Sequence, residues 1–221
     1  MTSTRPVRLL VFAREPEPGR VKTRLIPALG AQGAATLYAA LLDRVLSVAA
    51  ASAVGALELW ADRAPAGAGL RARSEALGIE LRVQSGGDIG VRMDDALTRV
   101  LAEGACPVLV GSDLPGLTVE HFRSAAAAFE AGAEAVFAPA DDGGYGLVGL
   151  ARPRPSLFAA MRWSTADVMA ETARRLDANA VPWRRIAPVW DVDDPADLPR
   201  LATLPDFAPL LATLGWTQAT G

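Results

Sequence analysis

The sequence predicts an α/β fold around a mostly parallel sheet, on three observations. Short apolar runs alternate with longer segments of helical periodicity, which is the pattern of strands joined by crossover helices. Acidic or glycine-rich loops follow several of these runs, where parallel sheets present their ligand-binding loops. Hydrophobic residues make up 51% and charged residues 21% of the 221 residues, as in an ordinary globular domain. We therefore expect a single domain over residues 1–221, with its core over about residues 7–204.

Six runs have the length and apolar character of strands. They are Arg8–Ala13, Ala56–Asp62, Ile79–Gln84, Pro107–Asp113, Ala135–Ala140 and Gly146–Ala151. Only a glycine-rich link separates the last two runs, with no helix between them. We therefore expect an antiparallel or crossing strand at that point.

Helical patterns lie between these runs. We expect helices after Gly30 over Ala31–Ser52, and at Asp88–Ala102, Val119–Ala131, Ala166–Ala178 and Ala196–Leu204. In the first of these, Leu37, Leu41 and Val45 recur at helical spacing. The segment Ala64–Arg73 is rich in alanine and glycine, and we expect a mobile loop there.

Composition excludes several classes of function. The formal net charge of −3 argues against a general nucleic-acid binder. A single cysteine, Cys106, and a single histidine, His121, exclude an internal disulfide, a Cys-rich zinc site and a His-pair metal site, so any metal ligands must be oxygens. The N-terminal apolar run is too short for a secretory signal, and no later run approaches the length of a membrane span. We expect a cytoplasmic protein with no nucleic-acid or membrane partner, and a homo-oligomer stays open.

The loop after the first strand is strongly basic. It reads REPEPGRVKTR over Arg14–Arg24, in a chain that is acidic overall. Such a loop lies where a parallel sheet binds phosphates, so a di- or triphosphate could be neutralised by Arg14, Arg20, Lys22 and Arg24. The spacing of glycine and lysine does not match a P-loop. The alternative is a solvated turn whose own glutamates pair with the cations, and charge alone does not decide between the two.

The run PVLVGSD brings Ser112 and Asp113 to the end of a strand. A lone carboxylate at such a place is more commonly the cap of a turn or helix. Other acids also follow strand-like runs and could converge with it, namely Asp141, Asp142, Asp191, Asp193 and Asp194. Two carboxylates beside a phosphate are ligands that suit Mg²⁺.

Three further stretches are ambiguous by themselves. QSGGDIGVRM and PADDGGYGLVGL place glycines beside acids, where the backbone could approach a ligand closely. Paired glycines are more commonly turns, and Tyr145 is more commonly a packed aromatic residue. In RWSTADVMAET we expect Ser164 or Thr165 to cap a helix, with Trp163 covering its first turn.

Taken together, the motifs FAREPEPGRVKTRL, GGDIGVRM, GSDLPGLT, DDGGYGLVGL, WST and DVDDPADL resemble the bacterial GT-A-like family labelled arsenosugar-biosynthesis-type glycosyltransferases. The resemblance extends from about Leu9 to Leu201. More distantly, KTRL, SDLP and DVDDPADL resemble the phospholactate guanylyltransferases and the molybdenum-cofactor nucleotidyltransferases. The resemblance implies the nucleotide-diphospho-sugar transferase fold, a Rossmann-like three-layer sandwich of the GT-A type.

The resemblance also implies a site. Asp113 and Asp193 would bind Mg²⁺ or Mn²⁺, with Asp193 preferred to Asp191 because Asp194 and Pro195 look like the start of the next helix. SDLP has one acid where many GT-A enzymes have Asp-x-Asp. The nucleotide would be bound by Ala13, Arg14, Gly19, Lys22, Arg24, Gln84, Gly86, Gly87, Asp88, Arg92 and Ser112. The acceptor would be bound by Gly143, Gly144 and Tyr145. The catalytic residues would be Lys22, Arg24, Asp113 and Asp142, with Asp142 as general base.

Three functions follow from these expectations. The first is metal-dependent transfer of a sugar from a nucleotide-diphospho-sugar to a small-molecule acceptor, which the resemblance favours. The second is transfer of a nucleoside monophosphate from a nucleoside triphosphate to a phosphorylated or acidic metabolite, with release of pyrophosphate; Lys22 and Arg24 together suit a triphosphate. The third is a non-catalytic nucleotide-binding module, in keeping with the single acid of SDLP.

Overall fold

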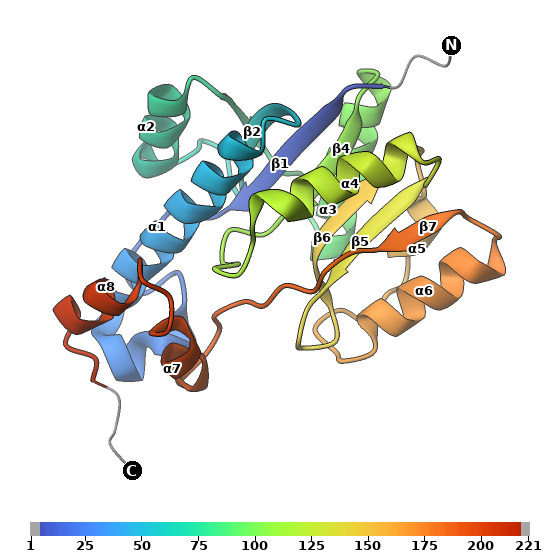
Figure 1. Cartoon of the computed structure of the whole chain (residues 1–221). Helices are drawn as coiled ribbons and strands as arrows, with labels where there is room; N and C mark the ends of the chain where they lie inside the picture. Colours follow the sequence, from blue (N-terminus) through green and yellow to red (C-terminus); the bar gives the residue numbers. More distant parts are fainter. Residues whose placement is uncertain (1–4, 218–221) are drawn as a thin grey trace.

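One mixed sheet organises residues 5–217, the part of the chain that this computed structural model describes. Its strands are β1 (Val7–Ala13), β2 (Gly55–Ala61), β3 (Glu80–Val83), β4 (Cys106–Val110), β5 (Ala135–Pro139), β6 (Tyr145–Leu150) and β7 (Trp183–Arg185). They lie in the order β3-β2-β1-β4-β6-β5-β7 (Figure 1). Only β6 runs antiparallel to its neighbours among these strands. The mostly parallel α/β fold and the antiparallel strand at the glycine-rich link are both confirmed. The sequence prediction omits β7, because three residues carry too little pattern.

Helices cover both faces of the sheet and make the outer layers of a three-layer sandwich (Figure 1). They are α1 (Ile26–Ser52), α2 (Ala68–Leu77), α3 (Ile89–Ala102), α4 (Val119–Glu130), α5 (Pro155–Phe158), α6 (Val168–Ala178), α7 (Leu198–Leu201) and α8 (Ala208–Thr213), with 3-10 turns η1 (Thr23–Leu25) and η2 (Pro195–Asp197). Leu9 and Val11 pack with α1, α2 and α4, whereas Leu10 and Phe12 pack with α3, α5 and α6. Because β1 is covered on both faces, it reads as a continuous apolar run.

The long helix α1 is interrupted at Gly30, whose φ of 69° and ψ of 165° are not helical. The expected start after Gly30 is therefore right for the main part of the helix, although a short helical turn precedes it. By length and composition alone, Thr23–Ser52 could cross a membrane, which our expectation about apolar runs overlooked. Half of its most apolar window is buried in the protein. We interpret it as a core helix.

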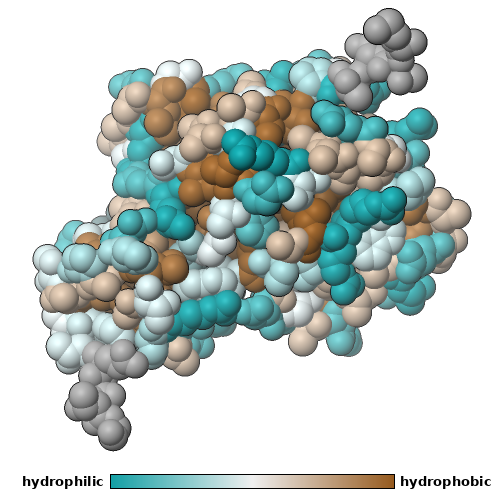
Figure 2. Space-filling model, viewed as in Figure 1, coloured by the Kyte–Doolittle hydropathy of each residue, from teal (hydrophilic) through white to brown (hydrophobic). Residues whose placement is uncertain are grey.

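The C-terminal segment packs back onto the N-terminal half of α1. In Figure 1, α7 and α8 lie beside the start of α1. Leu198 of α7 and Phe207, just before α8, share a buried cluster with Leu25 and Leu37. This packing carries the acidic segment between β7 and α7 past the end of the sheet, next to the loop that follows β1. On the face that α1 and α4 cover, polar and apolar residues are interspersed (Figure 2).

The expectation of a mobile loop over Ala64–Arg73 was wrong, because α2 begins at Ala68. No side chain of α2 caps its own start. Instead, the carboxylate of Glu15, in the loop after β1, accepts hydrogen bonds from the backbone N–H groups of Gly69 at 2.7 Å and Leu70 at 3.1 Å. A negative group is favoured at a helix N-terminus, where backbone N–H groups lack partners. Sequence reasoning missed the helix because its cap comes from a distant loop.

We predict that Glu15→Gln destabilises the protein by about 1 kcal/mol, since it weakens two charge-assisted hydrogen bonds at a helix N-terminus. The free energy of unfolding in urea measures the loss, and hydrogen exchange should locate it in α2. Glu17→Gln is the matched control, because the Glu17 carboxylate pairs with Arg20 and Arg63 at the surface. A loss for the Glu15 variant no larger than that for the Glu17 variant would contradict the capping role.

Candidate nucleotide-binding site

A cavity of about 480 Å³ opens at the carboxyl ends of β1 to β4. The connections from β1 diverge at this point, with β2 on one side and β4 on the other, and such a switch point is where open α/β sheets bind ligands. The predicted residues that line this first cavity are Ala13, Arg14, Lys22, Arg24, Gln84, Arg92, Ser112, Asp113 and Asp193. The fold therefore gathers most of the predicted nucleotide site around one hollow.

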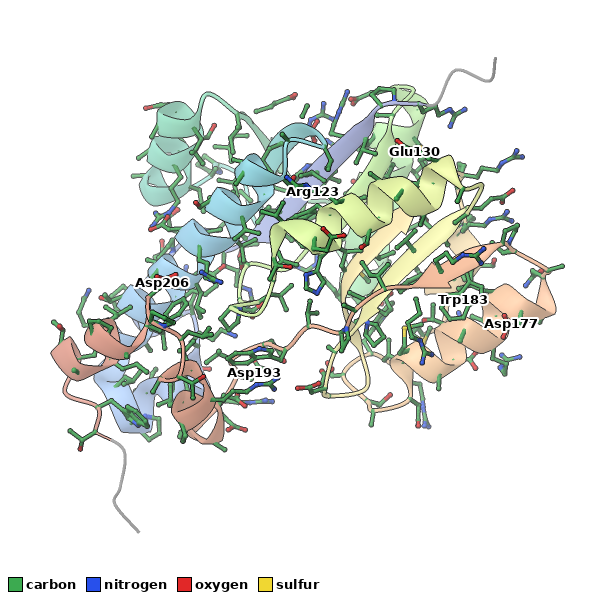
Figure 3. All side chains as sticks on the ribbon, in the orientation of Figure 1. Arg123, Glu130, Asp177, Trp183, Asp193 and Asp206 are labelled. Carbon is green, nitrogen blue, oxygen red and sulfur yellow. The ribbon has the colours of Figure 1, made fainter. Side chains whose placement is uncertain are left out.

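Lys22 is the centre of this site. Its Nζ donates to Asp113 Oδ2 at 2.6 Å and to Asp193 Oδ1 at 2.8 Å, and its side chain is only 6% exposed. The guanidinium of Arg24 lies 3.9 Å from Asp193 Oδ2. Asp193 belongs to the segment between β7 and α7 (Figure 3), whereas Asp113 follows β4. Three distant parts of the sequence thus meet at one ammonium group.

The backbone around Lys22 is fixed on both sides. Val21 is buried against Tyr38, and Leu25 is fully buried in the cluster beneath α7 and α8. Between them Lys22 has φ 45° and ψ 45°, a left-handed conformation that is uncommon for a residue with a side chain. Such strain persists only where the surroundings impose it and often marks a functional site.

The two carboxylates determine the charge state of Lys22. Burial would by itself lower its pKa, but the attraction of Asp113 and Asp193 outweighs burial and raises the pKa above the usual value. Lys22 is therefore a permanent cation at neutral pH. The surface-turn interpretation of the basic loop does not hold for this lysine, although it does hold for Arg20, which donates to Glu17 at 3.2 Å on the exposed side of the loop.

Tyr38 of α1 joins the two loops that flank the first cavity. Its hydroxyl accepts from the backbone N–H of Arg14 at 2.8 Å and forms a 2.7 Å hydrogen bond with Ser112 Oγ. Burial raises the pKa of this phenol, so it stays protonated. Sequence reasoning missed Tyr38, because a tyrosine inside a helix gives no signal of what it contacts.

Asp191 adds a further acid beside this pair. Its pKa is raised to about 6, first by burial and then by the negative charges of Asp193, Asp113 and Asp142. Asp113, Asp142 and Asp191, from the segments after β4, β5 and β7, all lie around one hollow, so several carboxylates are near one another. Lys22 compensates for only part of this negative charge.

These residues fit a hard divalent cation. The donors are all carboxylate oxygens, and Lys22 uses only one oxygen each of Asp113 and Asp193. Within residues 5–217, no group of three or more His, Cys, Asp or Glu side chains is arranged around one point. Bound Mg²⁺ or Mn²⁺ would thus take its remaining ligands from phosphate or water, as Mg²⁺ usually does.

The other end of the first cavity is polar and hydrogen-bonded. Gln84 is buried, donates to the Trp60 carbonyl at 2.8 Å, and accepts from Arg92 at 3.4 Å. Asp62, at the end of β2, also lines the cavity, and its Oδ1 is buried without a hydrogen-bond partner. An unpaired buried acceptor beside a cavity can receive an N–H or O–H of a ligand. Asp62 was not among the predicted site residues, although its place at a strand end was a usable signal.

A second cavity, of about 250 Å³, adjoins the first on the β6 side of the sheet. Phe12, Ile89, Gly111 and Asp113 line both cavities. Of the residues predicted to contact the acceptor or act as base, it is lined by Asp142, Gly144 and Tyr145. Gly143 lies outside this lining and packs instead against the backbone of Ala166, where a Cβ would lie 2.1 Å from the carbonyl oxygen.

The predicted role of the WST motif was wrong. Helix α6 begins at Val168, later than expected, and no side chain caps it. Ser164 has φ 61°, and Thr165 Oγ1 donates to the carbonyl of Arg162. Trp163, Ser164 and Thr165 line the second cavity instead. The motif resembles a helix start locally, and only tertiary packing reveals that it forms a cavity wall.

Four residues of the predicted nucleotide set lie outside the lining of the first cavity, namely Gly19, Gly86, Gly87 and Asp88. Asp88 instead caps α3, where its carboxylate accepts from the backbone N–H of Val91 at 2.9 Å. Gly19 and Gly87 have φ values of 79° and 102°, which glycine adopts without strain. Turn geometry explains these glycines without a ligand.

Comparisons with known proteins agree with this fold. Residues 45–165 match a family described as an uncharacterized protein conserved in bacteria (DUF2064). No protein of curated function matches the chain significantly in sequence. Among solved structures, the chain is similar to a protein from Desulfovibrio desulfuricans G20 whose proposed activity is nucleotide-diphospho-sugar transfer, with 29% identity, 95% of each chain covered and a TM-score of 0.81.

Two more distant structures share the fold. Glucosyl-3-phosphoglycerate synthase from Mycobacterium tuberculosis, solved with Mn²⁺, uridine diphosphate and phosphoglyceric acid, has 13% identity and a TM-score of 0.53 over 97% of this chain and 80% of its own. A 4-diphosphocytidyl-2C-methyl-D-erythritol synthase has 12% identity and a TM-score of 0.59 over 90% of this chain and 97% of its own. The fold thus occurs in both sugar-transferring and nucleotidyl-transferring enzymes.

We predict that Asp191→Asn stabilises the metal-free protein at alkaline pH but not at acidic pH. The pKa of Asp191 is raised to about 6 in the folded protein, so its ionised form destabilises the fold above that pH. The destabilisation disappears as the pH falls and the carboxyl is protonated in both the folded and the unfolded state. The variant should gain about 1–2 kcal/mol in unfolding free energy near pH 8, and the gain should vanish near the usual carboxyl pKa of about 4. Urea unfolding at both pH values measures this difference.

Asp206→Asn is the control for this pH comparison, since Asp206 is an exposed partner of Arg44 with a side chain 69% exposed. Its effect should depend much less on pH. An equal change at both pH values for the Asp191 variant would show that Asp191 is not held near other carboxylates.

Proposed function

This chain belongs to the DUF2064 family of bacterial proteins, and we propose that it is a metal-dependent glycosyltransferase that moves a sugar from a nucleotide-diphospho-sugar to a small-molecule acceptor. The observation that carries the proposal is the convergence of Lys22, Asp113 and Asp193 at the rim of a cavity that four cations line. Those cations are Arg14, Lys22, Arg24 and Arg92. Such a rim suits a diphosphate, and the similarity to the Desulfovibrio protein supports this type of donor.

Each end of the first cavity suits one part of the donor. At the end away from Lys22, the unpaired Oδ1 of Asp62 suits an N–H or O–H group of a base or ribose. Gln84, whose amide already bonds to Trp60 and Arg92, lines the same cavity. At the other end, Lys22 and Arg24 stabilise the negative charge that develops on the departing diphosphate. Mg²⁺ or Mn²⁺, when held by Asp113 and Asp193, supplies additional positive charge to the phosphate oxygens.

Asp142 is the proposed general base. It lines the second cavity, where an acceptor hydroxyl would lie, and its Oδ1 accepts from the backbone N–H of Gly144 at 2.9 Å. That hydrogen bond fixes the carboxylate and leaves Oδ2 for a proton. Asp191 lines the same cavity and is the neighbouring acid that could replace it in this role.

The alternative is nucleotidyl transfer from a nucleoside triphosphate to a phosphorylated or acidic metabolite. Arg24 supports it, because this exposed guanidinium beside Asp193 could reach a third phosphate. A bound nucleotide without chemistry is the third possibility. We favour sugar transfer, since the second cavity is lined by three acids and an acidic acceptor would be repelled there.

An assay of the released product separates these functions. We predict that the protein, incubated with Mn²⁺, a panel of nucleotide-sugars and bacterial extract as acceptor source, releases nucleoside diphosphate. With nucleoside triphosphates in place of nucleotide-sugars, it should release no pyrophosphate. Pyrophosphate release would favour nucleotidyl transfer, and tight nucleotide binding with neither product would favour a binding module. Asp113→Asn should abolish the metal-dependent activity while retaining the fold.

We predict that Lys22→Met weakens binding of uridine diphosphate at least tenfold but changes binding of uridine little. The reason is that a charge-assisted contact to phosphate contributes about 1.5–3 kcal/mol, whereas the proposed nucleoside position lies at the other end of the first cavity. Calorimetric titration measures both affinities. Arg20→Gln is the matched control, because Arg20 belongs to the same loop but pairs with Glu17 outside the first cavity. Equal losses for both ligands would indicate a folding defect rather than a lost phosphate contact.

A further inference from the structure

The second cavity is mainly apolar. Its wall combines side chains from β1, α3, β4, β6 and α6, including Phe12, Met93, Leu109 and Val148. The volume of about 250 Å³ suits a ring or short chain with a few substituents. Because burying apolar surface drives binding in such a hollow, the body of its ligand is expected to be apolar on at least one face.

The charges on the second cavity are all negative. Asp113, Asp142 and Asp191 line it, and within residues 5–217 no lysine, arginine or histidine does. Arg24 and Arg200 lie in a neighbouring hollow, where Arg200 donates to Asp141 at 2.5 Å. The first cavity has the opposite character. Asp113 is paired with Lys22, and Asp142 and Asp191 also border the hollow that holds Arg24 and Arg200, although neither forms an ion pair within residues 5–217. An anion in the second cavity would therefore be repelled mainly by Asp142 and Asp191, which is costly in a partly desolvated site.

Trp163 supplies an aromatic ring to this apolar wall. Its indole ring lies against Gly90, where a Cβ would be 2.5 Å from the ring, and packs edge-on to Tyr145 at a centroid distance of 6.5 Å. The indole Nε1 is buried and has no hydrogen-bond partner. A Cβ on Gly90 would also lie 2.7 Å from this Nε1, so the N–H edge of the ring faces α3, and the indole N–H serves as a reporter of the cavity wall.

The second cavity is placed for a reacting group. It shares Gly111 and Asp113 with the first cavity, so its occupant lies directly beside the proposed phosphate site. Asp142 and Asp191 stand on the same wall. A hydroxyl or amine brought there would have a carboxylate available to take its proton.

We infer that the second cavity binds an acceptor that has an apolar body and no negative charge, either neutral or cationic. The inference rests on the proposed function for the role of acceptor, and it adds the chemical class of that acceptor. It excludes phosphorylated and carboxylated metabolites as preferred occupants.

Three probes with one body and different charge test this inference, namely benzyl alcohol, benzylamine and benzyl phosphate. The readout is the indole N–H signal of Trp163 in a ¹⁵N-labelled protein, identified by its loss in Trp163→Phe. We expect benzyl alcohol and benzylamine to shift this signal with an affinity about tenfold or more above that of benzyl phosphate, since several nearby carboxylates repel the phosphate. Equal or tighter binding of benzyl phosphate would overturn the inference, and so would the absence of any shift with all three probes.

Charge variants make the test specific. In the double variant Asp142→Asn and Asp191→Asn, the ratio of the affinity for benzyl alcohol to that for benzyl phosphate should fall several-fold. Asp141→Asn is the matched control, because Asp141 is adjacent in sequence but pairs with Arg200 outside the second cavity. An unchanged preference in the double variant would overturn the electrostatic basis of the inference.

A titration with uridine diphosphate and Mg²⁺ separates this inference from the proposed function. If uridine diphosphate shifts the NMR signals of residues near Lys22 and benzyl alcohol still binds, both the proposed function and the inference are supported. If the protein does not bind uridine diphosphate but does bind benzyl alcohol next to Trp163, the proposed nucleotide use is refuted and the inferred class of ligand for the second cavity still holds. A protein that bound uridine diphosphate but preferred benzyl phosphate would refute the ligand class alone.

Discussion

The ion pairs of Lys22 with Asp113 and Asp193 are the interaction on which the site depends. They join the loop after β1, the end of β4 and the segment before α7, and they do so with a lysine that is almost fully buried. A buried ammonium is stable only when carboxylates surround it, and carboxylates gathered in this way need a cation. Removing Lys22 leaves Asp113 without its partner, whereas removing either aspartate leaves Lys22 paired with the other. The same charges that fix the loops are therefore those that a phosphate and a metal would use.

This arrangement requires packing that lies far from the chemistry. Leu198, Leu201 and Phe207 hold the C-terminal segment against α1, and without that contact Asp193 would have no fixed position beside Lys22. At its other end, the loop after β1 is attached through Glu15, whose carboxylate accepts hydrogen bonds from the start of α2. The loop that bears Lys22 is thus attached at both ends, which explains how a left-handed lysine is maintained.

Sequence reasoning predicts the parts of this molecule that local pattern determines. The apolar runs identify the long strands, and the rule that ligands bind at strand ends selects Lys22, Ser112 and Asp113 correctly as neighbours. It fails where the partner is distant. The cap of α2 comes from Glu15, the hydroxyl that links the two loops comes from Tyr38, and Trp163 forms a cavity wall only because Gly90 leaves room for its ring. Such contacts have no local signature, because tertiary packing alone creates them.

The two cavities differ in charge and polarity. One is lined by cations and adjoins the paired carboxylates, and the other is apolar with an acidic rim, so a charged donor and an uncharged acceptor would each have a distinct place. Asp113 stands at their junction, where a bond between the two substrates would form. The cations of the first cavity come from the segment after β1 and from α3, whereas Asp142 and Asp191 of the second cavity come from the segments after β5 and β7. Under the proposed function, this division would place the two substrates on either side of Asp113.

A crystal structure with Mn²⁺ and uridine diphosphate tests the central claim most directly. Anomalous scattering should place the metal against Asp113 and Asp193, with the diphosphate in contact with the metal and with Lys22. A diphosphate bound away from the first cavity, or a metal ion that neither Asp113 nor Asp193 coordinates, would contradict the account.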